Sequence, residues 1–270
     1  MITLSSDFGS PYPAAMKGVI CQRTDARLVD ISHEFPRQDV RATAFWLTQV
    51  LPYMPPATHL VVVDPGVGTD RDVLVARAGE HALVGPDNGV LRPAARSLAP
   101  EREIEWFRLA VPEDGQPTDP GTDWPPVPAS STFHGRDVFA PVAARVHELG
   151  VDAIADEPTF EPVDSDQSLL ELEFPGPTLE STSATGEVLV ADEFGNAITN
   201  IPGSVIAPLL GNAIVVNGES FPVREMYAAV DSGEPLVTVG SHEQVELAVN
   251  QGRGTETFDL AVGDTVSLSW

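Results

Sequence analysis

The chain of 270 residues carries 40 acidic residues against 15 basic ones, a formal net charge of −25, and 42% of its residues are hydrophobic. This composition predicts one large folded domain or two modest ones, and the lack of a basic stripe excludes nucleic-acid binding as the expected function. No apolar run reaches the roughly 18–20 residues of a membrane span. No secretory signal is visible and Cys21 is the only cysteine, so we expect a cytoplasmic protein. The acids are spread along the chain, which predicts the acidic surface of a halophilic protein.

The first part of the chain alternates strand patterns with helix patterns. Ile2–Ser5 predicts a strand and Val40–Val50 an amphipathic helix. Leu60–Val63 is a run of four aliphatic residues, which is typical of a strand buried on both faces. Lys17–Cys21 and Leu28–Ile31 continue the α/β pattern, and further short strands are predicted at Val73–Ala76 and Ala82–Val84. The alternation indicates an α/β domain over residues 1–160, with a mostly parallel sheet flanked by helices.

The second part of the chain changes class. The proline-rich stretch 112–131 predicts a surface excursion, and a helix is expected from Asp137 to about Leu149. A proline- and acid-rich linker follows at 161–186. Beyond it come short strands without a convincing helix, at Val188–Val190, Ala213–Val216, Leu236–Val239, Val245–Val249 and Thr265–Leu268. Residues 187–270 are therefore predicted to form a small all-β barrel domain.

The most informative point is where Leu60–Val63 ends at Asp64. A proline and two glycines force a tight loop there, and Arg71 closes it. Open α/β sheets bind ligands at the carboxyl ends of their strands, so a carboxylate and a guanidinium in this loop point to chemistry. Taken alone, the stretch also fits an ordinary turn that an Asp64–Arg71 ion pair fixes.

Four further regions place polar side chains beside glycines: Ser6–Gly9, Thr132–Pro141, Asp192–Ile201, and Gly240–His242 with Leu247–Gly252. Together with the Asp64 loop, and in this order, they resemble the S-adenosyl-L-methionine (SAM) hydroxide adenosyltransferases. These enzymes are SAM hydrolases related to the nucleophilic fluorinases and chlorinases. The resemblance extends over both domains, apart from the 112–131 excursion and the linker.

The resemblance implies a homotrimer with active sites between neighbouring subunits, which converts SAM and water to adenosine and L-methionine without a cofactor. Asp64, Arg71 and His134 take the positions of the residues that position and activate the water. Arg71 is suited to stabilise a developing hydroxide and to keep Asp64 ionised. Either Asp64 or His134 can accept the proton of the water, and the sequence leaves both open.

The resemblance also implies where the substrate binds. Asp7 matches a carboxylate that holds the two ribose hydroxyls, and Tyr227 matches an aromatic residue that stacks on adenine. The other matched positions are purine contacts at Asn196, Asn250 and Gln251, and methionine contacts at Asp192 and Ser241.

Departures from the halogenases favour water over halide. Gly135 replaces the serine that holds halide in the fluorinase, and Asp64 stands where the fluorinase has a tyrosine. Two other positions differ from relatives near the substrate. Gln38 stands where relatives carry an aromatic residue near the ribose, and His242 stands where the fluorinase has an arginine near the methionine carboxylate.

Two other functions fit parts of the pattern: a halide-dependent SAM halogenase, and a non-catalytic sensor that binds SAM or adenosine. The Asp64, Arg71 and His134 set favours an enzyme, because a pure binder has no use for a water-activating trio. No spacing of cysteine and histidine predicts a metal site. The remaining histidines are expected in loops or on a polar helix face, at His33, His59, His81 and His147.

Overall fold

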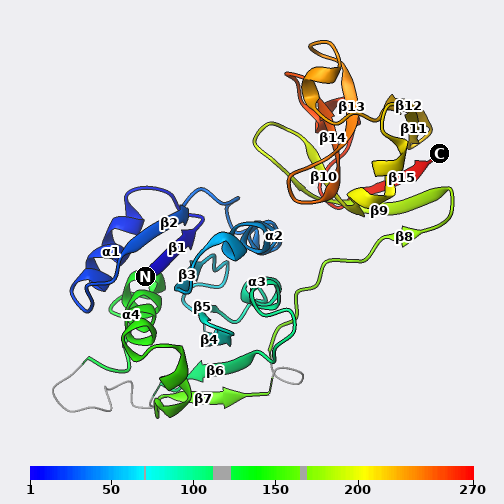
Figure 1. The fold of residues 1–270 in the computed structure, drawn as a ribbon. Helices are drawn as coiled ribbons and strands as arrows, with labels where there is room; N and C mark the ends of the chain where they lie inside the picture. Colours follow the sequence, from blue (N-terminus) through cyan, green and yellow to red (C-terminus); the bar gives the residue numbers. More distant parts are fainter. Residues whose placement is uncertain (70, 112–122, 165–168) are drawn as a thin grey trace. The chain divides into compact units, whose positions relative to one another are not determined.

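The computed structural model describes residues 1–69, 71–111, 123–164 and 169–270. The chain divides into two units, Met1–Leu172 and Glu173–Trp270 (Figure 1). The segment 161–186, predicted as a linker, carries strand residues at both ends, in β7 (Phe160–Val163) and β9 (Ser183–Ala191). Residues 112–122 of the predicted excursion lie outside the described residues.

Seven strands build the sheet of the first unit, in the order β2-β1-β3-β5-β4-β6-β7. Their bounds are β1 (Ile2–Ser6), β2 (Leu28–Ser32), β3 (Thr58–Val62), β4 (Val73–Ala78), β5 (His81–Pro86), β6 (Glu105–Leu109) and β7. Strands β2, β1, β3 and β5 run parallel, whereas β4, β6 and β7 join antiparallel. The sheet is therefore mixed and not mostly parallel. The link between β4 and β5 is too short for a crossover, so these strands must form a hairpin.

Helices cover both faces of this sheet, as the sequence predicts. They are α1 (Tyr12–Cys21), α2 (Val40–Val50), α3 (Leu91–Leu98) and α4 (Ala140–Leu149), with a π-helix (Gly135–Phe139) before α4. In Figure 1, α1 and α4 lie on one side of the sheet and α2 and α3 on the other. Helix α2 has its predicted bounds, because the Asp39 side chain accepts a hydrogen bond of 2.8 Å from Ala42 N and caps it. No helix among the described residues is long and apolar enough to cross a bilayer.

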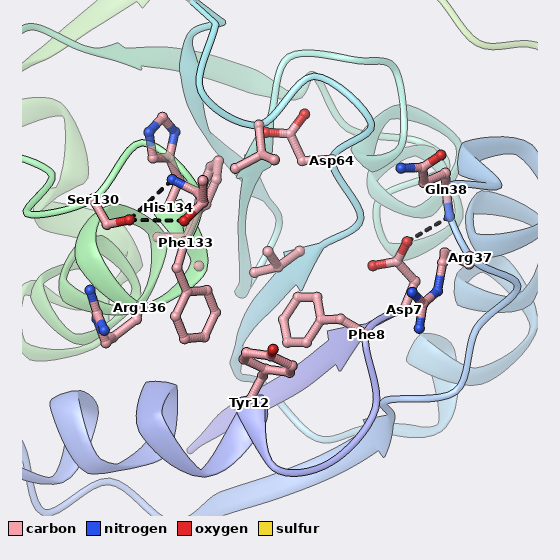
Figure 2. A pocket seen from close by; sticks show the side chains of 15 residues that line it. Asp7, Phe8, Tyr12, Arg37, Gln38, Asp64, Ser130, Phe133, His134 and Arg136 are labelled. Atoms are coloured by element: carbon pink, nitrogen blue, oxygen red, sulfur yellow. Dashed lines mark hydrogen bonds between the residues drawn. The ribbon is translucent and has the colours of Figure 1, made fainter.

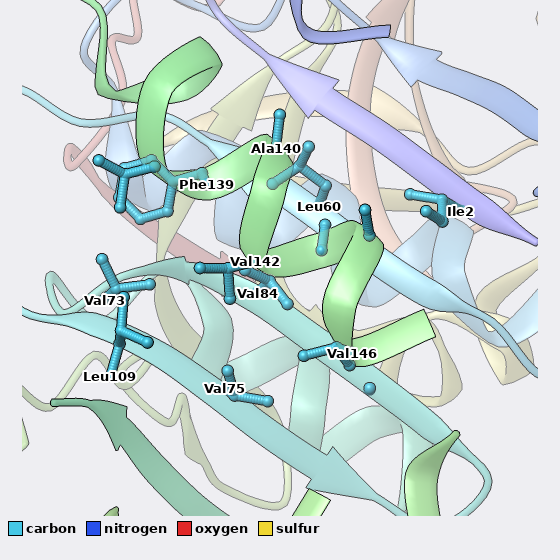
Figure 3. Close-up of a cluster of buried hydrophobic side chains, with 14 of the residues drawn as sticks. Ile2, Leu60, Val73, Val75, Val84, Leu109, Phe139, Ala140, Val142 and Val146 are labelled. Atoms are coloured by element: carbon cyan, nitrogen blue, oxygen red, sulfur yellow. The ribbon is translucent and has the colours of Figure 1, made fainter. Parts of the chain in front are cut away.

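The core of the first unit forms between the sheet and α4. Alternate strand residues such as Leu60 and Val84 point toward Val142 and Val146 of α4 (Figure 3). Every residue of β3 is buried, which is the burial on both faces that the aliphatic run predicts. These contacts hold β3 rigidly in the middle of the sheet.

The order of the strands reverses between β1 and β3. The chain leaves β1 through α1 to β2 on one side, and returns through α2 to β3 on the other. Ser6 pairs with Val62 at the end of this ladder, so the chain leaves the sheet at Asp7 and Asp64 from neighbouring strands. A crevice opens at such a reversal, which is where α/β sheets bind ligands.

The second unit is built of short antiparallel strands. They are β8 (Thr178–Leu179), β9, β10 (Ala197–Pro202), β11 (Ala213–Val216), β12 (Glu219–Pro222), β13 (Pro235–Val239), β14 (Gln244–Val249) and β15 (Thr265–Ser269). The order is β12-β11-β15-β9-β10-β14-β13, with β8 beside β9. A bridge between Val223 and Val237 brings the two ends of this order together. The sheet is thus nearly closed, as the predicted barrel requires.

Two histidines lie on strands, contrary to the sequence prediction: His81 begins β5 and His59 is on β3. His59 is fully buried, because β3 begins before the aliphatic run. Its Nδ1 is 2.8 Å from Thr3 Oγ1 and its Nε2 is 2.9 Å from His81 Nδ1. Burial, together with the neighbouring His81, lowers the pKa of His59 to about 3.

Because the His59 imidazole is buried, we expect the free energy of unfolding to fall in acid. Between its ordinary pKa of 6.5 and the folded value of about 3, the unfolded chain binds a proton that the folded chain does not, so stability falls as pH falls. From about pH 7 to about pH 5, the free energy of unfolding should fall by about 2 kcal/mol more in the wild type than in His59→Gln. Denaturant unfolding at both pH values measures this difference. Thr3→Val is the control, since it loses the hydrogen bond but keeps the titrating ring; equal pH dependence in His59→Gln and wild type would contradict the prediction.

Candidate active site

The loop after β3 is shaped around the Asp64 carboxylate. Gly66 N donates to Asp64 Oδ1 over 3.1 Å, and Val67 N donates to the Asp64 carbonyl over 3.2 Å. Asn88 Nδ2 donates to the Val63 carbonyl over 2.8 Å and fixes the end of the strand. The Gly66 N–H thus orients the carboxylate, while the other two bonds fix the backbone that carries it.

Gly66 makes room for Arg71. A Cβ atom on Gly66 would lie 2.8 Å from Arg71 Cζ, so a larger residue there would displace the guanidinium from its present position. Arg71 Nε is 3.5 Å from Asp64 Oδ1. Gly68 has a different role, since its φ of +85° is one that favours glycine and a Cβ there would lie 2.5 Å from the Ser131 carbonyl oxygen. The two glycines thus position the ion pair and bring the loop against the segment that leads to His134.

Burial and charge act on Asp64 in opposite directions. The side chain is only 6% exposed, and this burial raises the pKa of Asp64. Arg71, the Gly66 N–H and His134 lower it, and Asp7 adds a smaller rise. The net pKa is raised, so Arg71 acts in the predicted direction but burial outweighs it. A carboxylate with a raised pKa is a better proton acceptor near neutral pH.

A cavity of about 550 Å³ opens in front of this carboxylate. Asp64 lines it together with Asp7 from the end of β1 and His134 from the start of the π-helix (Figure 2). Arg71 joins this group through Asp64. The reversal of strand order between β1 and β3 therefore brings four of the predicted site residues together in the first unit.

His134 precedes the π-helix at a crowded point. The turn before it is fixed by Asp137, which accepts from Ser130 N over 2.9 Å and from Arg136 Nη2 over 2.9 Å. The helical turn begins at Gly135, two residues before the predicted start. A Cβ on Gly135 would lie 3.0 Å from Met16 Sδ and 3.2 Å from Val62 Cγ1, so this position is packed against the core.

Asp7 is held from the side of α2. Its Oδ2 accepts a hydrogen bond of 2.6 Å from Gln38 N. Gln38 adopts φ of 61°, a left-handed conformation that is unusual for a residue other than glycine. The departure at Gln38 thus contributes its backbone to the site and fixes the orientation of the Asp7 carboxylate.

The other predicted residues lie in the second unit. Asp192 accepts two bonds from Asn196, of 2.8 Å from the backbone N–H and 3.0 Å from Nδ2, across the turn between β9 and β10. Asn250 Nδ2 donates to the Val230 carbonyl over 2.8 Å, and Gln251 Oε1 accepts from Ser232 over 2.9 Å. These contacts order the turns that carry the residues.

Glu246, which sequence reasoning missed, links two parts of this unit. It is 3% exposed on β14, accepts a hydrogen bond of 2.6 Å from Tyr227 Oη, and lies 3.4 Å from His242 Nε2. Burial and Glu246 raise the pKa of Tyr227 well above its ordinary value. Ser241 is exposed in the turn beside His242. The signal in the sequence was an acid inside the apolar run of β14, Val245–Val249.

Family models match both units. The SAM hydroxide adenosyltransferase N-terminal domain matches residues 2–154, and the C-terminal domain of the same family matches residues 186–267. The chain belongs to this family.

Curated relatives and solved structures agree with this membership. Proteins named (R)-S-adenosyl-L-methionine hydrolase are 38% identical in Salinispora tropica, over 99% of this chain and 97% of the relative, and 39% identical in Thermus thermophilus, over 97% of each. A crystal structure of an uncharacterized conserved protein from Thermotoga maritima has a TM-score of 0.79 at 31% identity, over the full length of both chains. A conserved hypothetical protein from Thermus thermophilus has a TM-score of 0.73 at 34% identity, covering 99% of this chain and 98% of its own.

The raised pKa of Asp64 predicts how kcat/KM depends on pH on the acidic side of its optimum, which we call the acidic limb. If ionised Asp64 is required, kcat/KM falls as pH falls through a pKa above the ordinary 3.8. Arg71→Gln removes a charge that lowers this pKa, so the limb should move to higher pH while kcat/KM drops by about 100-fold. Gly66→Ala should move the limb the same way, because its Cβ displaces the guanidinium.

The matched control is Arg77→Gln, which removes an arginine that pairs with Glu105 and Asp152 on another part of the sheet. It should leave the limb in place. A limb that stays fixed in Arg71→Gln, or that moves equally in Arg77→Gln, would refute the role of the Asp64–Arg71 pair.

The packing at Gly135 predicts a stability difference between two glycines. Gly135→Ala should lower the free energy of unfolding by about 1–3 kcal/mol, because the added methyl group overpacks the core. Gly18→Ala, in α1 with nothing within 4 Å, should raise it by about 0.5–1 kcal/mol. Denaturant titration of both variants tests the pair, and stabilisation of both would show that the π-helix adapts freely.

Proposed function

We propose that the chain hydrolyses SAM to adenosine and L-methionine in the cavity of the first unit. The observation that carries this is the buried Asp64 carboxylate, 3.5 Å from Arg71, in a cavity that Asp7 and His134 also line. The names of the curated relatives support the reaction and specify the R configuration. We take the R epimer at sulfur as the substrate.

The chemistry follows from the leaving group. Water attacks C5′ of the ribose, the O–C5′ bond forms, and the C5′–S bond breaks with its electron pair going to sulfur. The sulfonium becomes a neutral thioether, so no acid is needed to protonate methionine. The site has to supply an oxygen with partial negative charge and to take up one proton, which later passes to solvent.

Asp64 is the proton acceptor in this proposal. Its burial raises its pKa toward the working range, and His134 lies on the same cavity to orient the water. Arg71 beside Asp64 stabilises the developing negative charge on oxygen. His134 is the alternative acceptor, and it would leave Asp64 ionised throughout the reaction.

Substrate binding divides between the two units. Asp7 in the first unit is proposed to hold the ribose hydroxyls, with its orientation set by Gln38. The second unit is proposed to supply the rest, namely Tyr227, Asn196, Asn250 and Gln251 for the purine and Asp192 and Ser241 for methionine. A homotrimer in which neighbouring subunits complete each site would join the two sets, and no cofactor takes part.

A halide-dependent reaction is the second candidate, and the packing at Gly135 disfavours it. Met16, Phe133 and Val62 surround the position, so the structure leaves little room for a serine that would hold halide. A halide ion in this site would also lie near the Asp64 carboxylate, and repulsion between the two negative charges would raise the energy of the bound halide.

The first test is to incubate the purified protein with each SAM epimer in isotopically labelled water and to identify the products by chromatography and mass spectrometry. Adenosine labelled at the 5′ oxygen, with methionine, is the expected result from the R epimer. Asp64→Asn should reduce the rate by about 1,000-fold or more, because both charge and basicity are lost.

The control exchanges chloride for acetate at the same potassium concentration. Turnover should be unchanged by this exchange. A 5′-halo-adenosine product would establish the halide reaction, and SAM that binds without conversion would establish a binding protein.

A further inference from the structure

Four phenylalanine and tyrosine rings line the cavity that Asp64 and His134 also line, and three of them, Phe8, Tyr12 and Phe133, contact one another. Phe8 follows β1, Tyr12 begins α1, and Phe133 precedes His134. Their ring centroids are 5.6–6.2 Å apart, and their planes meet at 81–87°. We call these three residues the aromatic wall; Figure 2 shows them grouped on one side of the cavity, away from Asp64.

The rest of the first unit does not fully cover the aromatic wall. Tyr12 remains 54% exposed although its ring contacts the other two. Rings at right angles present π faces and edges in several directions, and a cation within about 6 Å of a ring centroid is attracted to its face. The wall is thus a surface suited to a small, soft, positively charged group.

The charges around the cavity are compatible with such a group. Two carboxylates, Asp7 and Asp64, and two guanidinium groups, Arg37 and Arg136, line the cavity. In Figure 2, Arg37 lies toward Asp7 and away from the three rings. The Arg136 guanidinium lies 5.3 Å from the Phe133 centroid and is paired with Asp137 over 2.5 and 2.9 Å. In Figure 2, Arg136 lies on the other side of Phe133 from Phe8 and Tyr12. Arg136 therefore contacts the Phe133 ring on the side away from Phe8 and Tyr12, and Asp137 neutralises its charge.

The substrate of the proposed reaction carries its positive charge on sulfur. The sulfur bears the adenosyl, methionyl and methyl groups and one lone pair. With the first two groups held in place, the two epimers at sulfur differ only by exchange of the methyl group with the lone pair. The methyl group carries positive charge and is attracted to a π face, whereas the lone pair is repelled by it.

We propose that Phe8, Tyr12 and Phe133 receive the S-methyl group of the sulfonium and so select one epimer of SAM. This inference rests on the proposed function, because attack by a water at Asp64 places the departing sulfur on the opposite side of C5′, away from Asp64, where Figure 2 shows the three rings. The rings are specificity-determining residues in this assignment. The wall binds and discriminates, while water activation stays with Asp64, Arg71 and His134.

The test measures kcat/KM for each purified sulfur epimer in Tyr12→Leu and Phe133→Leu. Leucine keeps apolar bulk and removes the π face, so the ratio of kcat/KM between epimers should fall by about tenfold or more. Tyr12→Phe keeps the ring and should hold the ratio within about twofold. Tyr53→Leu, an 84% exposed tyrosine that is not among the cavity-lining residues, is the matched control and should leave it unchanged.

Calorimetric binding of SAM and of S-adenosyl-L-homocysteine, its neutral analogue without the methyl group, provides the second readout, measured in the Asp64→Asn background so that SAM is not consumed during the titration. With the three rings intact the protein should bind SAM more tightly than the analogue, and the leucine substitutions should reduce that ratio of affinities about tenfold. If the wild type binds one epimer selectively but never converts it, the proposed reaction fails and the aromatic wall stands. If the leucine variants keep both ratios, whatever their overall activity, the aromatic wall is refuted.

Discussion

The parallel pairing of β1 with β3 is the constraint on which the first unit depends. Because Ser6 lies opposite Val62, the chain leaves both strands at the same edge, and Asp7 and Asp64 come to the same cavity. The same ladder carries the aliphatic residues that pack against α4. A slip of one residue would turn the core residues to the other face and separate the carboxylates, so the fold and the site share one register.

Where β3 ends, burial and a neighbouring positive charge act in opposite directions on the pKa of Asp64. Burial alone would favour the neutral acid, and a fully formed ion pair alone would make a weak base. The 3.5 Å separation of Arg71 from Asp64, which the missing side chain of Gly66 permits, lies between these limits. The pKa of Asp64 is raised, and the nearby guanidinium still favours negative charge on an attacking oxygen.

Local patterns in the sequence predicted local structure well. Helix α2 has a capping Asp39 and a clear apolar face, and β3 is a continuous aliphatic run, so both could be placed from neighbouring residues alone. What could not be predicted depends on contacts between distant residues. The β4–β5 hairpin follows from the short link between its strands. The addition of β6 and β7 to the sheet, the burial of His59 against Thr3, and the room that Gly66 leaves for Arg71 are set by tertiary packing, which residue type and spacing do not encode. The candidate site followed the same division: its carboxylates stood at recognisable strand ends, whereas Glu246 and the aromatic wall emerged only from the folded arrangement.

The chain has a single lysine, and its surroundings have a practical consequence. Lys17 lies on α1 with its Nζ 2.6 Å from Asp30 Oδ2 of β2, on the helix that begins with Tyr12. Reagents that acylate amines therefore meet one side chain and the α-amino group, and no others. A fluorophore coupled at Lys17 would occupy one defined position on the helix that borders the cavity, without any mutation of the protein.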